Sequence, residues 1–146
     1  MTEPHPHFAE AGGRPTAAGR YVCVADVEAV EFVDGLVFRP VLGEGSLVNF
    51  VYFEANTEAP THVHAEEQFT IVLDGEFEFN LDGEVRTMRP GDVAVIPPWV
   101  PHGAFTRDTT CREIDVFTPP RRSLLDHAKR QAELRNAGPP PAGAGV

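Results

Sequence analysis

The stretch FTIVLDGEFEFNLDGEVRTMRPGDVAVIPP, residues 69–98, decides the fold of this chain. It consists of short apolar or alternating segments separated by Gly, Asp and Pro, which is the pattern of short β-strands joined by turns. The segment EFEFNL alternates strictly between polar and apolar residues, so this strand has one face on a core. The dipeptides Asp74-Gly75 and Asp82-Gly83 are typical of tight hairpins, because glycine accepts a positive φ. The stretch therefore predicts two successive hairpins.

Segments of the same kind flank this stretch on both sides. They are YVCVADV, LVFRPVL and SLVNFVYFEA before it and GAFT and REIDVFT after it. Many short antiparallel strands predict a sandwich or barrel, so the expected fold class is all-β. One helix follows the strands, over residues 123–135. We expect Ser123 to cap it, with Asp126 completing a capping box and basic residues gathering at its end.

The chain of 146 residues fits one domain. Residues 1–19 and 136–146 are rich in Pro, Gly and Ala, so we expect two disordered tails around a barrel domain at 20–135. No apolar run approaches the roughly 20 residues that span a bilayer, and the start lacks the features of a secretory signal. We therefore expect a cytoplasmic protein with no membrane partner.

Charge and cysteine content narrow the possible partners. With 12 Lys and Arg against 22 Asp and Glu, the formal charge of −10 repels phosphate backbones, so we do not expect nucleic acid as a partner. Cys23 and Cys111 are far apart, and each lies in an apolar stretch where a free thiol is expected as buried filler. Any metal ligands must therefore come from histidines and oxygen groups.

The segment THVHAEEQ, residues 61–68, has the spacing of a metal site. Residues two apart in a strand face the same side, so the imidazoles of His62 and His64 project together and can share one ion. Gln68, four residues after His64, faces the same side of such a strand. The isolated His102 follows the turn and apolar strand of GDVAVIPPWVPH.

These segments resemble the two characteristic motifs of the cupin superfamily, H-x-H followed by an acidic or amide ligand and Gly, and then G-x5-P-x4-H. The resemblance covers roughly residues 36–120 and implies a cupin barrel, that is, a double-stranded β-helix or jelly roll, here with one short C-terminal helix. It also implies a homodimer and one divalent transition metal (zinc, nickel, iron or manganese). The ligands implied are His62, His64, Gln68 and His102.

The chain departs from the usual motifs at three positions. Gln68 stands where many cupins have Glu, so the site carries one less negative charge; it should hold the ion more weakly and leave it a stronger Lewis acid. Trp99 stands where the second motif usually has Gly, and we expect its ring either to line the substrate pocket or to pack at the barrel mouth. Asn56 stands where the first motif opens with Gly, a mild change because Asn tolerates the left-handed conformation.

A third segment, REIDVFTPPR at residues 112–121, carries the remaining candidates. Strand parity puts Glu113, Asp115 and Phe117 on one face. Taken alone, Asp115 and Arg121 fit solvated surface charges. Together with H-x-H-x-x-E-Q and I-P-P-x-V-P-H-G, however, D-x-F-x-P-P-R resembles the cupins of pectin and alginate catabolism, which convert unsaturated uronates to linear keto sugars. The resemblance makes Asp115 the proton-transfer group, Phe117 a pocket wall and Arg121 a carboxylate clamp.

The resulting hypothesis is a metal-dependent enzyme acting on a small carboxylated or carbonyl-bearing substrate by non-redox proton transfer, as an isomerase, lyase or cyclase. Glu66 and Glu67, beside the ligands, are the next candidates for the proton-transfer group. The same barrel also resembles metal-dependent dioxygenases, polyketide tailoring enzymes and non-enzymatic metabolite-binding cupins. The fold does not choose among them.

Overall fold

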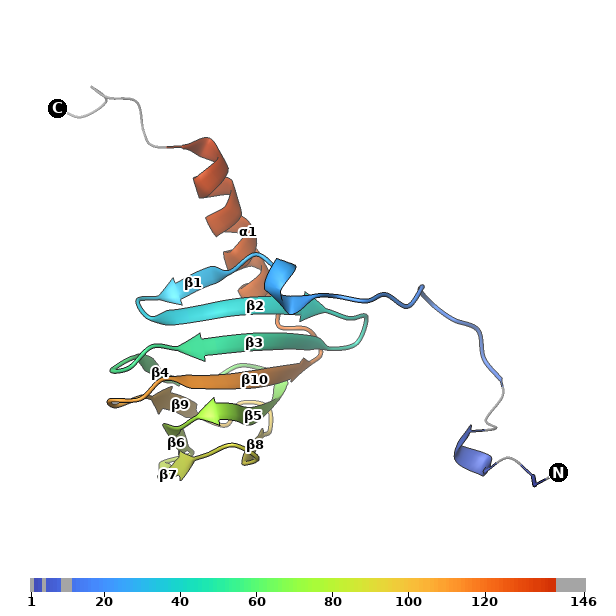
Figure 1. Ribbon diagram of the computed structural model, residues 1–146, viewed down its shortest axis with the longest axis horizontal. Helices are drawn as coiled ribbons and strands as arrows, with labels where there is room; N and C mark the ends of the chain where they lie inside the picture. The colour runs from blue at the N-terminus through green and yellow to red at the C-terminus, as the bar shows by residue number, and fades with distance from the viewer. Residues whose placement is uncertain (1, 4, 9–11, 139–146) are drawn as a thin grey trace.

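The computed structural model describes residues 2–3, 5–8 and 12–138, and its strands form two antiparallel sheets facing each other (Figure 1). The larger sheet has the order β1-β2-β3-β10-β5-β8, with β1 at Val30–Val33, β2 at Leu36–Leu42, β3 at Leu47–Phe53, β10 at Cys111–Thr118, β5 at Glu67–Gly75 and β8 at Val93–Ile96. The smaller sheet has the order β4-β9-β6-β7, with β4 at Glu58–His62, β9 at His102–Phe105, β6 at Phe77–Leu81 and β7 at Glu84–Met88. The predicted all-β class is confirmed.

The two predicted hairpins have different outcomes. β6 and β7 pair directly around Asp82 and Gly83, whose φ values of 51° and 89° are those of a tight hairpin turn. At Asp74-Gly75 the prediction is wrong, because β5 ends there and β6 begins in the opposite sheet. Gly75 has a φ of 72°, and a Cβ there would lie 2.0 Å from the carbonyl oxygen of Thr110. Glycine is required at this corner for close approach of two backbone segments.

The inward faces of β3, β5 and β10 carry both the core and the polar residues of the barrel interior. Burial alternates along β3 and β10, as strand parity predicts. On β10, Asp115 and Phe117 are buried, whereas Ile114 and Val116 on the other face are half-buried. The main apolar cluster consists of Leu36, Val51, Phe53, Val72, Phe77, Phe79, Met88, Ala94, Ile96, Ala104 and Cys111.

The helix α1 spans Arg122–Ala137, close to the predicted range. The predicted capping box is wrong: Arg121 occupies the N-cap position without a side-chain cap hydrogen bond, and Ser123 already lies inside the first turn. The helix packs on the barrel through Leu124, which joins Leu47 and Phe117 in a second buried cluster. This packing places the start of α1, and with it Arg121, beside the barrel interior.

The described residues before β1 lie outside the barrel (Figure 1). Two short 3-10 helices, η1 at Pro6–Phe8 and η2 at Val24–Asp26, precede β1. Between them, Thr16 and Arg20 hydrogen-bond to the end of β2 and the turn after it. The predicted C-terminal tail begins inside α1; its residues 139–146, like residues 1, 4 and 9–11 of the predicted N-terminal tail, lie outside the described residues.

The two cysteines differ in environment. Cys111 is buried in the main cluster as predicted, and burial raises the pKa of its thiol to about 12. Cys23 is exposed, so the prediction of buried filler is wrong for it; it lies in the connecting segment just before η2 and in no strand. Within the described part of the chain, none of the helices has the length and apolar character needed to cross a membrane.

Candidate metal centre

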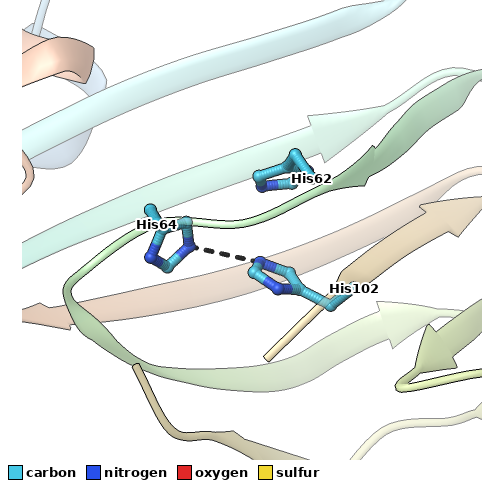
Figure 2. A group of neighbouring side chains, drawn as sticks. All are labelled: His62, His64 and His102. Carbon is cyan, nitrogen blue, oxygen red and sulfur yellow. Dashed lines mark hydrogen bonds between the residues drawn. The ribbon is translucent and has the colours of Figure 1, made fainter. Parts of the chain in front are cut away.

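Three histidines converge between the two sheets. His62 ends β4 and His102 opens β9, and the two are direct partners in the smaller sheet. His64 lies in the loop between β4 and β5, beyond the strand that sequence parity assumed. Figure 2 shows the three rings close together, and a nitrogen of each lies within 4.8 Å of the other two. The structure therefore brings the three predicted histidine ligands together.

Each imidazole is oriented by a backbone carbonyl. The three Nδ1 atoms lie 2.8–3.0 Å from the carbonyl oxygens of Pro60, Glu66 and Val100. A carbonyl oxygen can only accept, so each Nδ1 carries the proton and each Nε2 keeps a lone pair. Burial lowers the pKa of His62 and lowers that of His102 to about 4, so these two rings are neutral at pH 7.

The Nε2 atoms of His64 and His102 and the amide oxygen of Gln68 have the spacing of ligands around one ion, and a ring nitrogen of His62 lies within 4.8 Å of those of the other two histidines. Nε2 of His64 lies 2.9 Å from Oε1 of Gln68 and 3.2 Å from Nε2 of His102, which is itself 3.1 Å from Oε1 of Gln68. In this tautomer all three atoms are acceptors, so their contacts are repulsive unless a cation lies between them. Ligands bound about 2.0–2.2 Å from one ion are separated by about 3.0–3.5 Å. Three imidazole nitrogens and an amide oxygen therefore fit a divalent transition metal.

Gln68, 4% exposed on β5, is held in its orientation by two hydrogen bonds. Its Nε2 donates to Oγ1 of Thr70 at 2.8 Å and to Oδ1 of Asp115 at 3.0 Å. The Thr70 hydroxyl donates to the same carboxylate oxygen at 2.7 Å. Because the amide nitrogen is occupied in this way, the amide oxygen faces the histidines. Asp115 therefore positions a ligand of the centre.

Asp115 and Glu113 form a buried carboxyl pair on the inward face of β10, exposed by 9% and 3%. Burial raises the pKa of Asp115, although hydrogen bonds from Glu113, Thr70 and Gln68 lower it in part. Burial and the neighbouring charge of Asp115 raise the pKa of Glu113 well above its ordinary value. Glu113 is therefore the carboxyl that retains the proton, and Asp115 is the stronger acid of the pair.

Arg121 is a cation that faces the same interior. Its guanidinium carbon lies 5.6 Å from the centroid of the Phe117 ring, and its Nε is buried without a hydrogen-bond partner. Burial lowers its pKa, and no carboxylate of the described residues lies within ion-pair distance of it. Phe117 is 1% exposed and packs its ring edge against His64. An unpaired guanidinium in this position suits an anionic ligand group.

One cavity of about 350 Å³ is lined by several of these groups, although His64 is not among them. Its lining includes His62, Gln68, His102, Asp115, Phe117 and Arg121. The rest of the wall is mostly apolar and is contributed by Phe32, Val33, Leu36, Phe38, Val51, Phe53, Phe77, Phe79 and Leu124, among others. This size and lining are those of a small-molecule site.

Trp99 lies outside the cavity. Its side chain is 64% exposed, and the cavity lining does not include it. Its φ of 67° lies in the region that favours glycine, and its backbone N–H donates to the carbonyl oxygen of His64 at 2.8 Å. The structure thus leaves the ring at the surface, contrary to both expectations from the sequence. Asn56 adopts a φ of 54°, as expected for a position where the family has Gly.

The two alternative proton-transfer candidates, Glu66 and Glu67, differ in their position relative to the histidines. Glu66 lies beside the centre, with Oε2 at 3.6 Å from Nδ1 of His64. Glu67 is exposed on the outer face of β5, because it alternates with the inward-facing Gln68. Only Glu66 is near the histidines.

The sequence reasoning missed two residues of the cavity, Asn49 and Glu113. Asn49 lies on β3, fully buried, on the face that also carries Leu47 and Val51. A polar residue at an apolar position of an alternating strand was the signal that could have found it. Glu113 was placed on the right face, but no role was assigned to it.

A family comparison agrees with this fold over the middle of the chain. Residues 49–117 match the Cupin domain family. This segment is a cupin domain, and the two-sheet barrel is a cupin fold.

Solved structures of other proteins have a similar fold. KdgF from Halomonas sp. is 27% identical, with a TM-score of 0.69 over 73% of this chain and 99% of that chain. An RmlC-like cupin from Shewanella frigidimarina NCIMB 400 is also 27% identical, with a TM-score of 0.68 over 73% of this chain and 96% of that one.

A curated relative is similar over a shorter stretch. The cupin-domain-containing oxidoreductase fogC of Aspergillus ruber is 38% identical over 53 residues, which are 36% of this chain. The match covers 26% of the length of that oxidoreductase.

Proposed function

We propose that this protein is a metal-dependent enzyme that moves a proton on a small carboxylated or carbonyl-bearing substrate without redox chemistry, as an isomerase, lyase or cyclase does. The observation that carries the proposal is that Asp115, Arg121 and three of the four candidate ligands, His62, Gln68 and His102, line one cavity. A buried base, an unpaired cation and a Lewis-acid site are the groups needed to remove a proton beside a carboxylate or carbonyl.

The candidate metal ligands, Arg121 and Asp115 have different roles in the proposed reaction. A divalent ion held by the three histidines and Gln68 would act as a Lewis acid for the negative charge that develops on a substrate oxygen. Arg121 binds the substrate carboxylate through its planar guanidinium and so fixes which carbon faces the base. Asp115 accepts the proton from that carbon, exchanges it with solvent and delivers a proton to the product. Its raised pKa makes it a stronger base than a solvated aspartate.

Unsaturated uronates are the substrate class to test first. The motif D-x-F-x-P-P-R at residues 115–121, which resembles that of the uronate-degrading cupins, supports this choice. The position of the unpaired Arg121 at the cavity also supports a substrate that carries a carboxylate.

The test is turnover of an unsaturated uronate in D₂O by protein loaded with zinc, nickel or manganese. We expect loss of the substrate's ultraviolet absorbance, and NMR should show deuterium on a product carbon, because the proton passes through an exchangeable carboxyl. Formation of product without deuterium, or with consumption of oxygen, would contradict the proposal.

A metal-dependent dioxygenase is the second candidate, favoured by the 38% identity to the oxidoreductase fogC over 53 residues. The iron-loaded protein would then consume oxygen with its substrate, which an oxygen electrode detects. A metabolite-binding cupin without enzymatic activity would bind the same carboxylates with no turnover.

A further inference from the structure

The cavity contains two buried polar side chains to which the proposed proton transfer assigns no role. Asn49 is 0% exposed, and neither its Oδ1 nor its Nδ2 has a hydrogen-bond partner. Glu113 is 3% exposed, and its Oε2 also has none. Buried polar atoms in folded proteins are nearly always paired. Three unpaired atoms on two neighbouring residues, both lining the cavity, therefore indicate a place where a ligand supplies the partners.

The strand register places these two residues beside each other and beside Asp115. Asn49 on β3 is directly opposite Asp115 on β10, and Glu113 is opposite Val51. Asn49 and Glu113 are therefore diagonal neighbours on one face, within reach of one small group. Gln68 lies on the other side of β10, paired with Phe117 through β5. Asn49 thus lies across β10 from the candidate ligand Gln68, whereas Glu113 lies on β10 itself.

The chemistry of the unpaired atoms selects the ligand group. An amide offers a donor and an acceptor together, and Oε2 of Glu113 adds a second oxygen. A second anion is disfavoured, because the two carboxyls of Glu113 and Asp115 lie there with no cation among the cavity residues except Arg121. A neutral hydroxyl, which accepts one hydrogen bond and donates another, satisfies the amide nitrogen and one of the facing oxygens.

We infer that Asn49 and Glu113 form a hydroxyl-binding subsite, and that the substrate is a carboxylic acid with a hydroxyl group that reaches this subsite. The wall beside the subsite is apolar and includes Val51, Phe53, Phe77 and Phe79, so Asn49 and Glu113 are the polar groups there that can bind the hydroxyl. The inference rests on the proposed function for the carboxylate end, at Arg121, and goes beyond it at the hydroxyl end.

The test measures binding, so it does not depend on turnover. Zinc-loaded full-length protein is titrated calorimetrically with two matched pairs of acids, 4-hydroxybenzoate with benzoate and 3-(4-hydroxyphenyl)propanoate with 3-phenylpropanoate. We expect the hydroxylated member of at least one pair to bind about tenfold more tightly than its parent. Asn49→Leu, which has a similar size but no polar atoms, should bring this ratio to about one and leave the affinity for the parent acid unchanged. Glu113→Gln, which keeps a donor and an acceptor, should retain part of the preference.

Arg121→Ala is the matched control, because it should weaken both members of a pair equally. The inference is overturned if no hydroxylated acid binds better than its parent, including the case in which neither binds. It is also overturned if Asn49→Leu weakens both members alike. If the preference is observed but no carboxylate is ever turned over, the subsite stands and the proposed enzymatic function fails.

Thermal unfolding without ligand separates a binding role from a structural one. If the Asn49 amide has no partner in the free protein, Asn49→Leu should melt at the same temperature as the wild type or higher. A fall of several degrees would show that Asn49 is paired inside the free protein, and the inference would then be wrong.

Discussion

Replacing Asp115 separates its two roles, as a proton acceptor and as a support for a metal ligand. Asp115→Asn keeps an oxygen that can accept the hydrogen bonds from Gln68, at 3.0 Å, and Thr70, at 2.7 Å, but removes the basic carboxylate. Turnover should fall by about 10²–10⁴, the usual range for a lost general base. This corresponds to about 3–5 kcal/mol of transition-state stabilisation. Metal affinity should stay within about threefold of wild type, because the amide of Gln68 remains oriented.

Two further variants, Asp115→Ala and Thr70→Val, separate the effect of the carboxylate on turnover from its effect on the orientation of Gln68. Asp115→Ala removes the acceptor of the Gln68 amide as well as the base, so metal affinity should fall by about 10–100-fold in addition to the loss of turnover. Thr70→Val removes the hydroxyl that bridges Gln68 and Asp115 but keeps the carboxylate. It should therefore retain more activity than either Asp115 variant.

The assay is turnover of the unsaturated uronate together with metal content by elemental analysis and melting temperature for each variant. The reasoning is refuted in two ways. If Asp115→Asn loses its metal with its activity, Asp115 acts through the centre and not on the substrate. If it keeps full activity, the proton travels through another group, and Glu66 beside His64 is then the candidate to replace.

Further predictions concern the metal, the substrate clamp and pH. Wild-type protein reloaded with zinc, nickel or manganese should hold one ion per chain by elemental analysis, whereas His102→Ala should not; equal binding by the two proteins would contradict the ligand assignment. Arg121→Ala should chiefly raise KM for a carboxylated substrate, since uniform binding energy is lost while the proton step remains; a fall in kcat alone would show a different role. The pKa of Glu113 is raised in the folded protein. The Glu113 carboxyl therefore contributes fully to the free energy of unfolding below pH 4.5, the ordinary pKa of glutamate, and this contribution is lost as the pH rises through the raised pKa. Glu113→Gln should therefore gain stability relative to wild type as pH rises from about 4.5 to 8, measured by urea unfolding, and a constant difference across this range would refute the buried titration.

The sequence was sufficient for those features that depend on spacing alone. Strand alternation predicted the all-β fold, because a fixed side-chain period carries that information. The candidate ligands came from the resemblance of the two histidine segments to the cupin motifs, since His64 lies in a loop where strand parity does not apply. The same Asp-Gly dipeptide, however, serves as a hairpin at Asp82-Gly83 and as a corner between sheets at Asp74-Gly75. Local turn chemistry permits both, and only the pairing of distant strands decides between them.

Side-chain roles that depend on three-dimensional neighbours were harder to predict. The hydrogen bond between Gln68 and Asp115 joins residues that are 47 positions apart in the sequence. The surface position of Trp99 follows from a positive φ that its residue type does not suggest. Homodimerisation, implied by the family resemblance, stays a prediction.

The tautomer of the three imidazoles has a consequence for which ion the candidate centre would hold. Each Nδ1 is held by a neutral peptide carbonyl, and the remaining ligand is a neutral amide, so no ligand of the centre contributes a formal charge. Such a set discriminates weakly among divalent ions beyond the general order of their affinities. Exchange with the surroundings should be easy, and the ion found after purification should follow the supply in the growth medium. Comparing activities across metals therefore requires stripped protein reloaded with each ion in turn.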